Sequence, residues 1–80
     1  MTERKIEILK ATEEKMLVTS LMKQTHMSYS VLKLIVDRFV ETGLMTATPV
    51  TNYSRLVLLE STAKGIKIAK EYDRIVGALA

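Results

Sequence analysis

The stretch THMSYSVLKLIVDRFVETGLM, residues 25–45, decides the fold that we expect for this chain of 80 residues. Ser28 predicts the start of a helix, because a serine hydroxyl can accept a hydrogen bond from an unpaired N–H of the first turn. The apolar residues that then recur at helical spacing, and predict its buried face, are Leu32, Ile35, Val36 and Phe39. Gly43 predicts its end, because glycine tolerates the left-handed backbone that often terminates helices. We therefore expect a helix over residues 28–42 with a polar first turn.

The segments around this helix predict a mainly helical α+β fold. We expect further helices at about 3–12, 19–24 and 62–80, and strands at about 44–48 and 55–59. Thr19 and Thr62 are the expected N-caps of the second and last helices. A tight turn joins the two central helices, and the strands pair as a hairpin with a long loop. This order is that of a winged helix-turn-helix, which we expect as a single domain over residues 1–80.

The composition excludes several classes of site. The chain has no cysteine and one histidine, so we expect no disulfide, no metal centre and no cofactor. It carries no glycine-rich phosphate loop, paired catalytic carboxylates or nucleophile motif, and we therefore expect no enzyme activity. The net charge of +3 is compatible with a polyanionic partner but does not require one. Neither a signal peptide nor a membrane-spanning apolar run is visible, so we expect a cytoplasmic protein.

Three segments carry a resemblance to a known family. They are ILKA at residues 8–11, MSYSVL at 27–32 with FVETGLM at 39–45, and STAKG at 61–65. Their order and spacing make the chain resemble archaeal winged-helix DNA-binding proteins, in particular the small dimeric chromatin-type and regulator-type members. The resemblance implies a DNA-binding homodimer whose recognition helix starts in the MSYSVL segment. Ser61 and Ala63 depart from the family pattern, which has an apolar residue and a glutamate at these places.

The polar residues at the start of the central helix and in the hairpin loop are the candidate DNA contacts. Hydroxyl, amide and cationic groups can bond to base edges or phosphates, and a helix N-terminus favours an anion. The candidates are Ser28, Tyr29, Ser30 and Lys33 on the helix, Lys23 and Gln24 before it, and Asn52, Tyr53 and Arg55 in the wing at 46–57. The alternative is structural, with Ser28 only a cap, Tyr29 half-buried packing and the loop an ordinary turn. Asp37 and Glu41 would repel phosphates, so only the front half of the helix should approach DNA.

The last helix carries a wide apolar face. Its candidate dimerisation residues are Tyr72, Ile75, Val76 and Leu79, although this helix could instead pack only on its own domain. We predict a homodimeric transcriptional regulator that binds double-stranded DNA, with a recognition helix in the major groove and a wing on the backbone or in the minor groove. The alternative function is a non-enzymatic protein-interaction or assembly module, because fold does not fix function.

Overall fold

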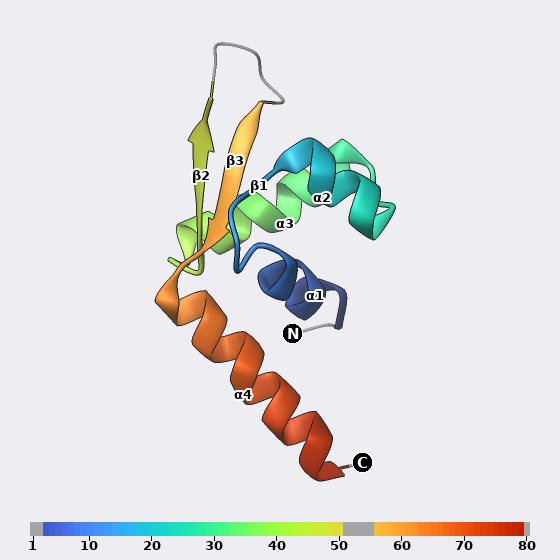
Figure 1. The fold of residues 1–80 in the computed structure, drawn as a ribbon, viewed down its shortest axis with the longest axis vertical. Helices are drawn as coiled ribbons and strands as arrows, with labels where there is room; N and C mark the ends of the chain where they lie inside the picture. The colour runs from blue at the N-terminus through green and yellow to red at the C-terminus, as the bar shows by residue number, and fades with distance from the viewer. Residues whose placement is uncertain (1–2, 51–55, 80) are drawn as a thin grey trace.

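The computed structural model describes residues 3–50 and 56–79 and has the predicted winged-helix architecture (Figure 1). The helices are α1 (Glu3–Ala11), α2 (Val18–Thr25), α3 (Tyr29–Glu41) and α4 (Ala63–Leu79), and the strands are β1 (Met16–Leu17), β2 (Met45–Pro49) and β3 (Val57–Ser61). The hairpin of β2 and β3 projects at one end of the molecule, and α4 runs toward the other end (Figure 1). Within the described ranges, no helix is long and apolar enough to cross a membrane.

α3 follows the predicted helix closely because both of its end signals act as expected. The Val31 N–H donates to the Ser28 hydroxyl at 3.4 Å, which confirms Ser28 as the N-cap. At the other end, the N–H groups of Gly43 and Leu44 donate to carbonyls in the last turn of α3, at 3.1 and 2.8 Å. These two bonds form a Schellman motif, for which Gly43 adopts a φ of +77°.

The sheet has three antiparallel strands in the order β1-β3-β2, one more strand than the sequence predicted. β2 and β3 form the expected hairpin, in a register from Met45 opposite Ser61 to Pro49 opposite Val57. β2 lies one residue later than predicted, and β3 continues beyond its predicted end at residue 59. β1 has two residues, which pair with Leu58 and Leu59 of β3. A strand this short shows no alternation that a sequence pattern could reveal.

α2 begins earlier than predicted and without the expected cap. Leu17 is its N-cap residue, with an extended backbone and no side-chain cap hydrogen bond, so the prediction that Thr19 caps this helix is wrong. The reason is that Leu17 also belongs to β1, where it pairs with Leu58. The chain therefore passes directly from the strand into the helix.

The core lies between the first three helices and the sheet. Its fully buried apolar side chains come from all of these elements, and the largest are Ile8, Leu9, Leu21, Leu32, Met45 and Leu59. Three members of the predicted stripe on α3, Leu32, Val36 and Phe39, are buried, and Ile35 is half-buried at its edge. α4 adds Ala69 to the core. Burial of the α3 stripe, which removes apolar surface from water, fixes which side of this helix faces solvent.

Two buried hydroxyl groups join the end of α1 to the end of β3. The side-chain oxygens of Thr12 and Ser61 lie 2.8 Å apart. The Ser61 hydroxyl donates to the Leu9 carbonyl at 2.7 Å, and the Ser61 N–H donates to the Thr12 carbonyl at 2.8 Å. Ser61 thereby satisfies a carbonyl that the last turn of a helix leaves unpaired. The residue that departs from the family pattern thus makes a contact that an apolar side chain could not make.

α4 begins where it touches the turn that ends α3. The Thr62 hydroxyl accepts from the Gly65 N–H at 3.2 Å, which confirms Thr62 as the cap, and it donates to the Gly43 carbonyl at 2.7 Å. The Thr62 N–H donates to the Leu44 carbonyl at 3.0 Å. Gly65 packs so closely on this turn that an added Cβ would collide with the Leu44 carbonyl oxygen. The junction therefore requires glycine at position 65.

Gly65→Ala should destabilise the protein, because the backbone of α4 must move away from Leu44 to admit a methyl group. We expect the free energy of unfolding to fall by about 1–3 kcal/mol, the usual cost of overpacking. Gly77→Ala is the matched control, because a Cβ there has nothing within 4 Å and alanine favours a helix by about 1 kcal/mol over glycine. Urea unfolding followed by circular dichroism measures both variants. Equal stabilities of the two variants would contradict the close contact.

Candidate nucleic-acid interface

The front of α3 presents two serines to solvent. Ser28 and Ser30 are both exposed, and their hydroxyl oxygens lie 3.5 Å apart. The Ser28 hydroxyl already accepts from the Val31 N–H, so its first role is to cap the helix. The exposed Ser30 hydroxyl has no role in capping. Of the two predicted serine contacts, Ser30 is therefore the one available to a ligand.

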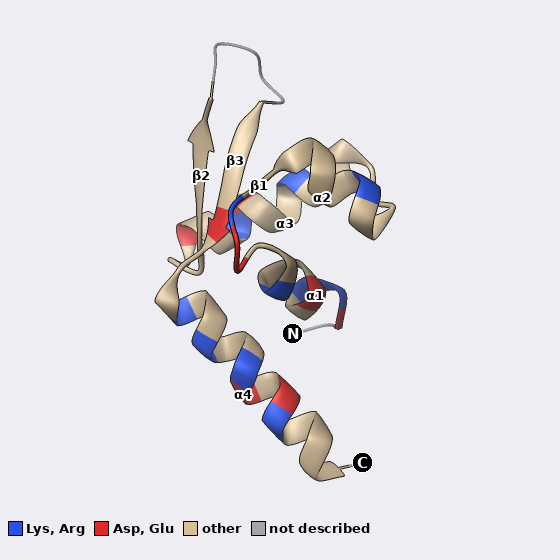
Figure 2. Cartoon of the chain, viewed as in Figure 1, with Lys and Arg blue, Asp and Glu red and all other residues tan. Residues whose placement is uncertain are grey.

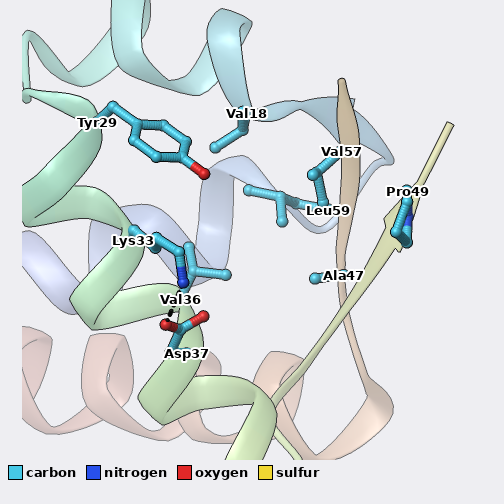
Figure 3. A pocket seen from close by; sticks show the side chains of 9 residues that line it. All are labelled: Val18, Tyr29, Lys33, Val36, Asp37, Ala47, Pro49, Val57 and Leu59. Carbon is cyan, nitrogen blue, oxygen red and sulfur yellow. Dashed lines mark hydrogen bonds and ion pairs between the residues drawn. The ribbon is translucent and has the colours of Figure 1, made fainter. Parts of the chain in front are cut away.

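Tyr29 and Lys33 face the hairpin, one turn apart on α3 (Figure 3). They line a shallow hollow between the helix and the sheet, whose other walls are Val18, Val36, Asp37, Ala47, Pro49, Val57 and Leu59. The Tyr29 ring lies across this hollow and is half-buried against the core. The packing role that the sequence left open for Tyr29 is therefore present.

Lys33 is held by an acid on its own helix. Its ammonium lies 2.7 Å from the Asp37 carboxylate, one turn further along, and both side chains are about half exposed, at 54% and 55% (Figure 3). The hydrogen bond to Asp37, together with the attraction between the two charges, raises the pKa of Lys33. Any phosphate that uses Lys33 must therefore compete with Asp37, which the sequence analysis had treated only as a source of repulsion.

The outward side of α3 is acidic and includes one large apolar residue. The exposed residues opposite the buried stripe are Ser30, Leu34, Asp37 and Glu41. Leu34 exposes 73% of its surface and was missed by the sequence analysis. The signal that could have found it is its position, because residues four apart share a helix side and Leu34 follows Ser30 by four. This side of α3 therefore combines a hydroxyl, an apolar side chain and two carboxylates.

The end of α2 is fixed against α1 beside the start of α3. The Arg4 guanidinium donates to the Thr25 carbonyl at 2.6 Å, and His26 turns the chain with a φ of +58°. Lys23 and Gln24, in the last turn of α2, are exposed as a phosphate contact would need. The bond from Arg4 therefore ties α1 to the turn between α2 and α3.

The hairpin stands next to α3 and its strands are paired up to the loop (Figure 1). The Val50 N–H donates to the Leu56 carbonyl at 2.7 Å, which extends the pairing beyond β2. The three predicted wing contacts, Asn52, Tyr53 and Arg55, lie outside the described residues. The structure therefore describes the paired strands at the base of the wing.

Most of the positive charge lies away from α3. On α3 the cations Lys33 and Arg38 are matched in number by Asp37 and Glu41, whereas α4 carries a series of cations along its length (Figure 2). Those on α4 are Lys64, Lys67, Lys70 and Arg74, and the last of them pairs with Glu71 at 2.8 Å. Within the described part of the chain, no three His, Cys, Asp or Glu side chains are placed to hold a metal ion.

The second half of α4 divides into a packed part and an exposed part. Tyr72 packs against the core, and Asp73 pairs with Lys10 of α1 at 2.6 Å, so α4 does pack next to the first helix. Beyond this contact, Ile75, Val76 and Leu79 expose 53%, 43% and 83% of their surfaces. Three of the four predicted dimerisation residues are therefore uncovered in the single chain.

Solved structures with a similar fold are MarR-type winged-helix regulators. A mutant of MarR from E. coli, complexed with operator DNA, is 24% identical with a TM-score of 0.83, and the match covers 96% of this chain and 56% of that chain. The transcriptional regulator BldR from Sulfolobus solfataricus is 26% identical with a TM-score of 0.85, over 99% of this chain and 58% of that chain. The likeness thus extends to a bacterial and an archaeal protein and supports the winged-helix resemblance without its archaeal, chromatin-type detail.

The chain spans somewhat more than half the length of these two structures. No protein-family model matches the sequence, and no curated protein matches it. The similarity therefore establishes the fold of the chain and leaves its ligand to be argued from the residues themselves.

Asp37→Asn should lower the pKa of Lys33, because the hydrogen bond and the charge that raise it both come from Asp37. Glu41→Gln is the matched control, because it removes one carboxylate from the same side of α3 without touching the pair with Lys33. Titration of the lysine side-chain signals by NMR measures the pKa in each variant. The same pKa in Asp37→Asn as in the parent protein would show that the pair is not formed in solution.

Proposed function

We propose that this protein is a DNA-binding transcriptional regulator that acts as a homodimer without a cofactor or enzyme activity. The observation that carries the proposal is the arrangement of α3 and the hairpin, which stand side by side as in a winged helix (Figure 1). The similar fold of a MarR mutant complexed with operator DNA supports it. Residues 28–42 would enter the major groove, and the wing at 46–57 would lie on the backbone or in the minor groove.

The front of α3 would read the DNA and bind its backbone. A major groove admits one helix, and base edges there accept and donate hydrogen bonds that Ser30 can match. Lys33 would exchange the Asp37 carboxylate for a phosphate, which replaces one exposed ion pair by another. Ser28 and Tyr29 would position the N-terminus of α3 against a phosphate, which the partial positive charge of a helix N-terminus favours.

The contacts around α3 would set its register on the duplex. Lys23 and Gln24 are exposed at the end of α2 and would bind phosphates, which position a protein without reading sequence. Asn52, Tyr53 and Arg55 would extend the contact from the wing, where arginine suits the minor groove. Because each chain brings few cations to this side, one copy would bind weakly.

Dimerisation would double these contacts and fix the spacing of two half-sites. The exposed end of α4, with Ile75, Val76 and Leu79, would form the interface, and Tyr72 would support it from the core side. Residues 62–80 would thus pack on their own domain at one end and form the dimer interface at the other.

A second candidate function is a protein-interaction or assembly module. The observation that favours it is the outward side of α3, where Leu34 is exposed and two carboxylates would repel phosphates. Duplex binding at low salt distinguishes the two functions, because an assembly module has no reason to bind DNA.

Lys33→Ala should weaken duplex binding and reduce its salt dependence. Removal of one phosphate interaction makes the slope of log K against log salt shallower by about one, so the slope for a dimer should change by about two. Lys70→Ala is the matched control, because it removes the same charge from the exposed side of α4. Fluorescence anisotropy with a duplex selected from random sequences, at several salt concentrations, measures both variants. No duplex binding by the parent protein at low salt would refute the proposed function.

Leu79→Lys should convert the dimer to a monomer, because it places a charge on the exposed apolar end of α4. Ala78→Lys adds the same charge to the adjacent, differently facing position of the helix and should leave the dimer intact. Sedimentation velocity at micromolar concentration without DNA measures the mass of each variant. A monomeric parent protein, or a dimer that survives Leu79→Lys, would contradict this interface.

A further inference from the structure

The outward side of α3 presents an apolar side chain that does not contribute to the buried core. Leu34 exposes 73% of its surface, and within the described residues only one large hydrophobic side chain, Leu79, is more exposed. Leu34 sits in the middle of α3, one turn after Ser30 and one turn before Asp37. Its position is therefore central to the surface that the proposed function places against DNA.

The apolar area around Leu34 is small. Val31, one turn earlier, is 49% exposed beside it, and the remaining exposed neighbours on this side are polar or charged. A stable protein interface buries about 800 Å² from each partner, far more than two aliphatic side chains can supply. The surface therefore fits a small apolar group better than an apolar protein face.

The major groove offers one such group. Thymine alone among the four bases carries a methyl group there, and aliphatic side chains contact it. Ser30 on one side of Leu34 can bond to a base edge, and Asp37 on the other can accept from the amino group of cytosine. Side chains of these kinds along one helix side match successive bases of a groove rather than a row of phosphates.

We propose that Leu34 is a specificity-determining residue that contacts the 5-methyl group of a thymine in each half-site. This proposal rests on the proposed function, because it requires α3 to enter the major groove. Leu34 would contribute discrimination between bases, since an aliphatic side chain has no attraction for the phosphate backbone.

The test replaces the thymines of a selected duplex by deoxyuridine one at a time, and each replacement removes only one methyl group. At one thymine in each half-site, we expect the affinity of the parent protein to fall about fourfold, the equivalent of one buried methyl group at about 0.8 kcal/mol. Leu34→Ala should bind the thymine and uracil duplexes equally. Val40→Ala is the matched control, because Val40 is a 41% exposed aliphatic residue of the same helix, outside this side. It should keep the fourfold difference.

The outcomes separate this proposal from the function on which it rests. Binding of the duplex with no effect of uracil at any thymine would overturn the role of Leu34 and leave the regulator intact. A fourfold effect that persists in Leu34→Ala would also overturn it, because another residue would then read the methyl group. No selection of any duplex by the parent protein would overturn both proposals together.

Discussion

The junction between the end of α3 and the start of α4 is the constraint on which the rest of this structure depends. Gly43 takes a left-handed backbone that lets the chain leave α3 and enter β2, and the carbonyls of Gly43 and Leu44 then accept hydrogen bonds from Thr62. The Lys64 ammonium adds a bond to the Thr42 carbonyl at 3.1 Å. Because these bonds join the end of α3, the start of β2 and the cap of α4, the three elements cannot rotate independently.

This junction explains how a small domain can hold two surfaces in a fixed relation. α3 is positioned by the junction at its C-terminal end and by packing of its buried stripe, so the exposed side chains near its N-terminal end, such as Ser30, are held in a fixed orientation. α4 leaves the same junction in the opposite direction from the hairpin and exposes its apolar end (Figure 1). In the proposed homodimer, the distance between two recognition helices would therefore follow from how the two α4 helices pair.

The sequence predicted the features that depend on local chemistry. Ser28 and Gly43 act through hydrogen bonds within a few residues of themselves, so their effect is readable without the fold. β1 was missed because its two residues become a strand only by pairing with β3, a segment distant in sequence. The bond of Lys33 to Asp37 and the exposure of Leu34 were also missed. The prediction considered the polar residues on the outer sides of α3 one by one, whereas both of these features depend on how neighbouring side chains of the folded helix lie relative to each other and to solvent.

The charges on α3 indicate which parts of the protein would supply affinity for DNA and which would supply specificity. Phosphate contacts supply most of the affinity for DNA and act on every sequence alike, so cations on the reading helix would raise specific and non-specific binding together. On α3 the two carboxylates offset the two cations, and Asp37 occupies Lys33. Attraction to the backbone would then come mainly from the end of α2, the wing and the second subunit, and Lys33 would add one phosphate contact by giving up Asp37. A reading helix whose charges cancel would lower the affinity for non-cognate sequences. Its carboxylates would be repelled by the phosphates there, whereas in a cognate site the base edges would donate hydrogen bonds to them.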